Sequence, residues 1–299
     1  MKLEIKKLVE GVSSGNFKDI ARALTVVENN LPQSKELLST VSVKNIPIIG
    51  ITGPPGAGKS TLVNSITEEL VKREKKVAIL AVDPTSPFNF GALLGDRIRM
   101  SRHFNNPNVF IRSIATRGSL GGLAVNIIEM TELLKSAKFD LIIIETVGVG
   151  QSEVDIAGIA DCSMVVLVPE AGDEIQNIKS GLMEIAQVFV VNKADRAGAD
   201  TFANNLIKQI KQQHQEIPVF KTIADKSIGV EDLTNYLLQL KEIENHRKFL
   251  LMTDKAYQLI SHFRMKDVDK KKLHLEVNEA MKNENFNLYK FVEKWISHS

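Results

Sequence analysis

Residues 53–60 read GPPGAGKS, and the architecture of the chain follows from this stretch. It fits the pattern G-x-x-x-x-G-K-[ST], which is typical of the phosphate-binding loop (P-loop) of nucleoside triphosphatases. The glycines let the backbone curl so that successive N–H groups converge on phosphate oxygens. Lys59 is then expected to reach the β- and γ-phosphates, and the Ser60 hydroxyl to bind Mg²⁺. The remaining residues expected to contact the nucleotide here are Gly53, Pro54, Pro55, Gly56, Ala57 and Gly58.

The segments on either side of the P-loop predict a strand before it and a helix after it. Residues 46–52 are apolar and β-branched, and residues 59–72 have the pattern of an amphipathic helix whose N-terminus faces the phosphates. Strand and helix patterns alternate from residue 46 onward, which indicates an α/β fold with a mostly parallel sheet covered by helices. The expected strands are residues 46–52, 76–83, 109–114, 139–145, 163–168, 187–192 and 217–221. The expected helices lie near residues 59–72, 92–104, 121–137, 175–185, 198–214 and 229–242.

Composition limits the classes of protein to which this chain could belong. Of its 299 residues 43% are hydrophobic and 25% are charged, so a sizeable core is possible, and the net charge of +2 does not favour a nucleic-acid partner. Cys162 is the only cysteine, which excludes an internal disulfide framework and a cysteine-cluster metal site, and its apolar surroundings favour core packing. The N-terminus lacks a signal or transit pattern, and the apolar runs are too short to cross a bilayer. We expect a cytoplasmic protein with no membrane partner.

Two predicted strands end in a carboxylate. Asp83 closes the second strand, where it could approach the Mg²⁺ shell or be an ordinary turn residue before proline. Glu145 closes a strand of four hydrophobic residues and precedes Thr146, with Gly148 three positions further on. This is the place of a Walker B acid and a switch loop, in which the Gly148 N–H can approach a γ-phosphate.

The sequence NKAD, residues 192–195, indicates which base is bound. The Asp195 carboxylate can accept hydrogen bonds from guanine N1–H and from its 2-amino group, and adenine offers neither donor on that edge. Asn192 would brace the loop, and the Lys193 stem could cover the base. At a strand end beyond a P-loop, this motif favours GTP over ATP.

The residue after the switch glycine predicts slow hydrolysis. Ras-type GTPases place a water-orienting glutamine directly after that glycine, whereas Val149 follows Gly148 here and Gln151 comes two residues later. An apolar side chain cannot orient water. We therefore expect slow intrinsic turnover that a partner stimulates.

Several longer motifs closely resemble the MeaB/ArgK family of P-loop GTPases, which are accessory proteins of adenosylcobalamin-dependent acyl-CoA mutases. The segments ETVGVGQSE and LLGDRIRM are more specific than the general GTPase motifs. The resemblance runs in family order across about residues 20–240. The matching segments are GPPGAGKST (53–61), AVDPTSP (81–87), LLGDRIRM (93–100), GSLGG (118–122), ETVGVGQSE (145–153), AGDEIQNIK (171–179) and NKAD (192–195).

The resemblance implies roles for further residues. Thr61 joins Lys59 and Ser60 at the phosphates and Mg²⁺, and Asp83 and Glu145 belong to the metal and switch environment. Candidate catalytic residues are Lys59, Glu145, Gln151 and Asp96. The base-supporting loop is expected at Thr222, Ile223 and Ala224, where the backbone N–H of Ala224 can still support guanine. Other switch residues implied are Arg99, Glu153, Asp173, Glu174 and Lys179.

The resemblance also implies a homodimer and a mutase client. The predicted organisation is an N-terminal helical extension (1–43), a GTPase domain (44–244) and a C-terminal helical dimerisation arm (245–299). Four stretches depart from the family pattern, namely Phe90-Gly91-Ala92, Ala115-Thr116-Arg117, Glu170, which stands in place of a glycine, and the base-supporting loop at Thr222-Ile223-Ala224. These changes leave nucleotide binding intact but lie in switch-like regions.

Two other functions compete with that of a mutase chaperone. A metal-insertion GTPase for another metalloenzyme would need a Cys/His cluster, and one cysteine with scattered histidines argues against it. A kinase-like regulator is the third reading, although NKAD selects guanine and the sequence has no acceptor-pocket signature.

Overall fold

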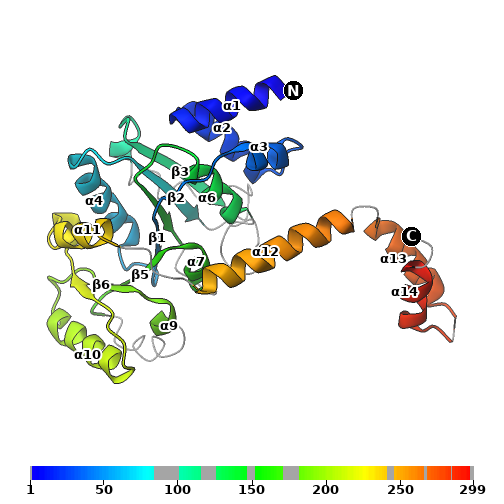
Figure 1. The fold of residues 1–299 in the computed structure, drawn as a ribbon. Helices are drawn as coiled ribbons and strands as arrows, with labels where there is room; N and C mark the ends of the chain where they lie inside the picture. Colours follow the sequence, from blue (N-terminus) through cyan, green and yellow to red (C-terminus); the bar gives the residue numbers. More distant parts are fainter. Residues whose placement is uncertain are drawn as a thin grey trace. The chain divides into compact units, whose positions relative to one another are not determined.

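The computed structural model divides the chain into two compact units, Met1–Lys248 and Phe249–Ser299. Figure 1 shows the order of the elements along the chain. No helix of the described residues is both long and apolar enough to cross a lipid bilayer. The structure describes residues 2–83, 101–115, 126–146, 152–170, 182–240, 246–265, 268–283 and 285–296.

The first unit is built on a seven-stranded sheet in the order β3-β2-β4-β1-β5-β6-β7. Every pair of neighbouring strands is parallel, so the predicted α/β class is confirmed. The strands are near-continuous apolar runs because both faces of the sheet are covered. They are β1 Ile48–Thr52, β2 Val77–Asp83, β3 Val109–Ala115, β4 Leu141–Glu145, β5 Cys162–Leu167, β6 Val188–Val191 and β7 Val219–Lys221.

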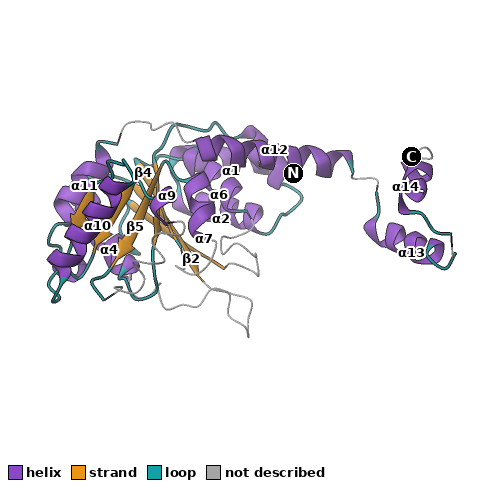
Figure 2. Ribbon diagram, turned by 90° about the horizontal axis from the view of Figure 1, so that it is seen from below, coloured by secondary structure: helices purple, strands orange, loops and turns teal. Residues whose placement is uncertain are grey.

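Helices cover the two faces of the sheet (Figures 1 and 2). Along β5, Met164 and Val166 pack in one core cluster with α4 and α11, whereas Val165 and Leu167 pack in a second cluster with α10. Alternate residues of a strand point to opposite faces, which explains this division. The described helices that follow β1 in this unit are α4 Lys59–Lys72, α6 Ile127–Lys135, α7 Ser152–Ile159, α9 Met183–Ile185, α10 Ala199–Gln212 and α11 Val230–Leu238.

The strand order brings the carboxyl ends of β1 and β4 together. Ile51 pairs with Glu145 across β1 and β4, and with Met164 across β1 and β5. In open parallel sheets a ligand binds at the carboxyl ends of the strands, where successive connections leave in opposite directions. β1 occupies that position, and the P-loop follows it directly.

Three N-terminal helices pack on the β3 side of the same unit: α1 Lys2–Ser14, α2 Phe17–Glu28 and α3 Ser34–Thr40. The Phe17 ring contacts the rings of Phe110 and Phe139, with centroids 5.5 and 6.1 Å away. Arg112 of β3 forms an ion pair with Glu28 at 2.5 Å. The division of the chain at residues 43 and 244 stays a prediction.

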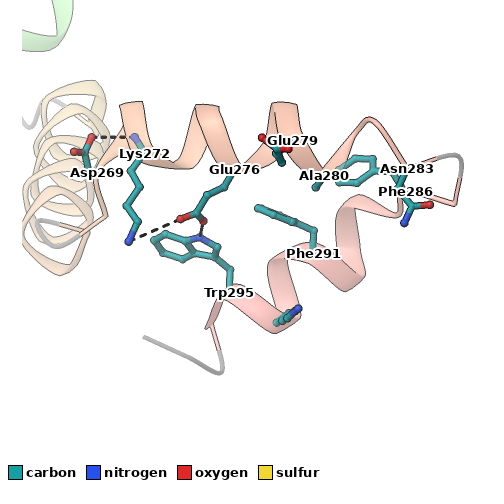
Figure 3. Close-up of a pocket in the computed structure, with 10 residues that line it drawn as sticks. Asp269, Lys272, Glu276, Glu279, Ala280, Asn283, Phe286, Phe291 and Trp295 are labelled. Atoms are coloured by element: carbon teal, nitrogen blue, oxygen red, sulfur yellow. Dashed lines mark hydrogen bonds and ion pairs between the residues drawn. The ribbon is translucent and has the colours of Figure 1, made fainter.

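The second unit contains most of α12 His246–Arg264, together with α13 Lys270–Ala280 and α14 Leu288–Ile296. Trp295 Nε1 donates to Glu276 Oε2 at 2.6 Å, and Lys272 Nζ lies 3.8 Å from Glu276 Oε1 (Figure 3). The cavity beside these residues, of about 880 Å³, is also lined by Phe286 and Phe291. No described residue from 249 onward is buried.

Several element boundaries differ from the sequence prediction. β1 and β7 begin later than expected, just after Pro47 and Pro218, because proline lacks the N–H that a sheet ladder needs. α7 lies between the predicted strands 139–145 and 163–168, where we predicted no helix. In the segments expected as helices 92–104 and 175–185, the described parts are the 3₁₀ helix Ser101–His103 and the short α9.

Candidate functional site

The P-loop connects β1 to α4 through three glycines with positive φ. These angles are 137° at Gly53, 77° at Gly56 and 87° at Gly58. A Cβ added at Gly53 would lie 2.1 Å from the carbonyl oxygen of Val166, so only glycine fits there. The loop is therefore a cradle whose shape depends on the absence of side chains.

Lys59 is the first residue of α4, and its ammonium group turns back into the P-loop. Nζ donates to the carbonyl oxygens of Gly53 at 2.8 Å and Pro54 at 3.1 Å. The side chain is buried, which is costly for a cation without such partners. These contacts hold a positive charge inside the loop, where a phosphate chain would need it.

Ser60 and Glu145 meet at the carboxyl ends of β1 and β4. Both residues are buried, and Ser60 Oγ donates to Glu145 Oε1 at 2.7 Å. Nearby, Thr146 Oγ1 donates to Thr52 Oγ1 at 3.0 Å. A hydroxyl and a carboxylate side by side supply the oxygen ligands that Mg²⁺ prefers, so this pair fits a P-loop magnesium ion.

Asn192, which follows β6, joins three loops. Its Nδ2 donates to the P-loop carbonyl of Ala57 at 2.9 Å. Its Oδ1 accepts from Thr222 Oγ1 and from the backbone N–H of Ala224, both at 3.1 Å. A Cβ at Gly58 would lie 2.5 Å from Asn192 Nδ2, so that glycine makes room for the contact. The phosphate end and the base end of the candidate site thus form one connected framework.

Lys193 and Asp195 stand on the exposed side of this framework. Lys193 has a left-handed backbone with a φ of 55°, and its Nζ donates to the carbonyl of Gly56 at 2.7 Å. Asp195 Oδ2 accepts from Lys226 Nζ at 2.9 Å. The hydrogen bond from Lys226 is the main cause that lowers the pKa of the Asp195 carboxyl, with Arg196 adding to it. Asp195 is thereby kept as an acceptor.

The loop at residues 222–224, which we predict to support the base, is tied to Asn192. The Ala224 N–H, our candidate for contact with guanine, donates to Asn192 Oδ1. The Ala224 carbonyl accepts from Ser65 Oγ of α4 at 2.5 Å. This loop is therefore tied to the helix that begins at Lys59.

Several candidate residues lie outside the part of the chain that the structure describes. They include the catalytic candidates Asp96 and Gln151 and the switch glycine Gly148. For Asp83 and Glu153 the backbone is described but the side chain is not. The other implied switch residues outside the described ranges are Arg99, Asp173, Glu174 and Lys179.

Sequence reasoning missed two residues that build the site. Ser65 contacts Ala224, and Lys226 contacts Asp195. Both contacts join residues that are far apart in the chain, so no local sequence pattern indicates them. Cys162 is buried in β5, and burial raises the pKa of its thiol to about 12. It is a packing residue, as we expected.

Comparisons with known proteins agree with this geometry. The family model described as methylmalonyl-CoA mutase-associated GTPase MeaB matches residues 20–284. A protein of Pyrococcus abyssi that is named as a GTPase is 46% identical over 255 residues, which cover 82% of this chain and 77% of that protein. The fused isobutyryl-CoA mutase of Geobacillus kaustophilus is 35% identical over 84% of this chain and 26% of its own length.

The fold is also similar to that of a solved structure. The crystal structure of a LAO/AO transport system kinase covers 100% of this chain with a TM-score of 0.67 and 23% sequence identity, and 98% of that chain is matched. At this identity the likeness concerns the fold alone. The family model and the Pyrococcus relative decide the family, and the chain belongs to MeaB, the methylmalonyl-CoA mutase-associated GTPases.

Proposed function

We propose that this GTPase is an accessory chaperone of an adenosylcobalamin-dependent acyl-CoA mutase of the methylmalonyl-CoA type. GTP hydrolysis would time the loading of the cofactor and the protection or reactivation of the mutase. The observation that carries the nucleotide part is the side chain of Asn192, which connects the P-loop to the loops expected at the base. Membership in a family of mutase-associated GTPases supports the choice of client.

The phosphate end of the site has the groups that phosphoryl transfer needs. Lys59 would exchange its bonds with the Gly53 and Pro54 carbonyls for phosphate oxygens, at little cost because the ammonium is already desolvated there. Ser60 and Glu145 would hold Mg²⁺, which supplies neutralisation of the charge on the β- and γ-phosphate oxygens. Asp83 is a further candidate for the metal environment.

The base end of the site favours guanine for a chemical reason. The Asp195 carboxylate accepts hydrogen bonds only, so it suits the N1–H and 2-amino donors of guanine. An adenine base would cover the carboxylate without offering it a donor on that edge, so the hydrogen bonds that it loses to water would not be replaced. Lys193, anchored on Gly56, would cover one face of the base.

Slow intrinsic hydrolysis and stimulation by the mutase are also part of the proposal. They rest on the sequence alone, in which Val149 follows Gly148 where Ras-type GTPases carry a glutamine. The residue that positions the attacking water would then be Gln151 or a residue of the partner.

We also propose that the chain forms a homodimer through its C-terminal helices. Phe249, Met252, Ala256, Leu259 and Phe263 follow the alternating three- and four-residue spacing of a coiled-coil seam along α12. The phenylalanines are 73% and 63% exposed. A unit of this size with no buried described residue lacks a core of its own, and a second copy offers the same apolar stripe.

One observation bears on the alternative of a metal-insertion GTPase. Within the described residues, no group of three or more His, Cys, Asp or Glu side chains could hold a metal ion. For a kinase-like role, the sequence has no acceptor-pocket signature.

The chaperone proposal is tested by cofactor transfer. Adenosylcobalamin would be offered to apo-mutase in the presence of this protein with GTP, GDP or no nucleotide, and loading would be followed by cobalamin absorption. We expect the extent or rate of loading to depend on the nucleotide, and the dependence to disappear with Lys59→Ala. Loading that is identical under all three conditions would overturn the chaperone role.

A further inference from the structure

The carboxylate proposed to select the base is held by a lysine that lies outside the P-loop and NKAD motifs. Lys226 Nζ donates to Asp195 Oδ2 at 2.9 Å, and the two side chains are 55% and 42% exposed. Lys226 is the last residue of the 3₁₀ helix Ala224–Lys226, and Asp195 follows β6. The contact therefore joins the two loops that are expected to surround the base.

The backbone that carries Lys226 is fixed by other contacts. Ile223 and Ile228 form an isolated antiparallel bridge with N···O distances of 3.0 and 3.2 Å, which closes the loop between them. Ser65 Oγ of α4 holds the Ala224 carbonyl, and Asn192 holds its N–H. The position of Lys226 is thus set by α4 and Asn192, and its side chain reaches Asp195 from a backbone that is already in place.

The neighbouring loop residue cannot take over this contact. Ile223, which precedes Ala224, has no polar side-chain atom. Thr222 Oγ1 donates to Asn192. Lys226 therefore supplies the side-chain hydrogen bond that Asp195 makes in the described structure.

We propose that Lys226 is a specificity-determining positioning residue, which orients the Asp195 carboxylate toward the N1–H and 2-amino groups of guanine. This inference rests on the proposed guanine site. Each carboxylate oxygen can accept two hydrogen bonds, so the bond to Lys226 leaves Oδ1 and one lone pair of Oδ2 for the base. The lysine thus restricts the rotation of the carboxylate without occupying all of its acceptor sites.

The positive charge of Lys226 also favours the selection of guanine by Asp195. The hydrogen bond from Lys226 lowers the pKa of the Asp195 carboxyl further below neutral pH. An ionised carboxylate cannot donate a hydrogen bond to a base with a carbonyl group in place of the 2-amino group. An exposed ion pair contributes little to folding stability. The effect of Lys226 should therefore appear in base selectivity and not in the stability of the chain.

The test compares the affinities of GDP and inosine diphosphate, which lacks only the 2-amino group. The selectivity ratio is the dissociation constant of inosine diphosphate divided by that of GDP, and we expect it to exceed one in the wild-type chain. Lys226→Met should reduce this ratio by about two- to five-fold, the size expected for an exposed ion pair. Lys226→Arg should retain most of the preference. Lys221→Met is the matched control, because Lys221 is 53% exposed, close to Lys226, and pairs with a different carboxylate, that of Asp200, at 2.7 Å. This variant should leave the ratio unchanged.

A second background separates positioning of Asp195 from direct contact with the base. In Asp195→Ala the ratio should already be low, and adding Lys226→Met should not change it further. An unchanged or higher ratio in Lys226→Met alone would overturn the proposal. The same fall in the ratio when Lys226→Met is added to Asp195→Ala would also overturn it. Failure of the guanine site itself would appear separately, as a wild-type chain that binds ADP as well as GDP.

Discussion

The unit that ends at Lys248 encloses most of its described apolar side chains, whereas the unit that begins at Phe249 leaves many of its own exposed. In α4, Leu62 and Ile66 are fully buried between the sheet and α11, but on α12 Leu259 is 52% exposed and Phe263 is 63% exposed. Both helices carry an apolar stripe, so the stripe alone does not make a core. The sheet completes the first unit, and we infer that a second chain completes the other.

The most direct test of this difference is to shorten one leucine side chain in each unit. Leu62→Ala should lower the free energy of unfolding by about 2–5 kcal/mol, because it opens a cavity in a closed core. Leu259→Ala, studied at a protein concentration at which the chain is monomeric, should change it by less than ~0.5 kcal/mol. Urea denaturation followed by far-UV circular dichroism measures both. Equal losses would mean that Leu259 is not the exposed residue that we describe.

A second prediction concerns the function of the first unit. Lys59→Ala should weaken GTP and GDP binding by roughly 10- to 100-fold, since a charge-assisted contact with the phosphates is lost. Titration with a fluorescent guanine nucleotide measures the change. Lys72→Ala at the other end of α4 is the control, because Lys72 is 65% exposed and its described ion pair is with Glu69 of the same helix. Wild-type affinity in Lys59→Ala would place the phosphates elsewhere.

A third prediction concerns the association of the second unit. Leu259→Glu combined with Phe263→Glu should raise the dimer dissociation constant at least about tenfold, because two apolar side chains lose their burial. Sedimentation velocity measures this, and GDP affinity should stay unchanged. The control is Leu31→Glu, an exposed apolar position in the first unit. A wild-type chain that is monomeric at every concentration would contradict the proposed arm.

The single tryptophan offers an independent measurement of the same association. Trp295 lies in α14 and donates to Glu276, so its fluorescence reports on the second unit alone. Its unfolding midpoint should rise with protein concentration if a second chain completes this unit. The midpoint of the sheet unit, followed by circular dichroism, should instead rise with GDP.

The smallest expected effect concerns the N-terminal helices. Arg112→Met removes the ion pair that links β3 to Glu28 of α2 and should lower the free energy of unfolding by about 1 kcal/mol, the net value typical of one intramolecular hydrogen bond. Arg22→Met, which loses an exposed contact of 3.9 Å with Asp19, should have no measurable effect. Thermal denaturation of the pair of variants tests whether the N-terminal helices share the core of the sheet unit.

Local patterns were sufficient for much of the fold. The helix predicted at residues 59–72 has those bounds in the structure, and the strand that ends at Glu145 ends there. Both follow from apolar periodicity and from glycine placement, which are properties of neighbouring residues. The P-loop and NKAD motifs likewise singled out Lys59, whose ammonium group turns into the P-loop, and Asn192, whose side chain joins the P-loop to residues 222–224.

The remaining features depend on contacts between distant residues. The pairing of Ser60 with Glu145 follows from the strand order, which periodicity does not encode. Lys226 could not be found from the sequence, because its reach to Asp195 depends on the bridge between Ile223 and Ile228. α7 was missed because its residues SEVDIAGI follow a glycine-rich motif and lack the spacing of an amphipathic helix.

The most direct test of the account is the release of phosphate from GTP by the full chain, measured alone and with an adenosylcobalamin-dependent acyl-CoA mutase of the methylmalonyl-CoA type. ATP serves as the control substrate. We predict that GTP turnover is slow alone, rises when the mutase is added, and is absent with ATP. GTP-specific turnover that no such mutase changes would contradict the proposed client, and turnover of ATP at the same rate would contradict the guanine site.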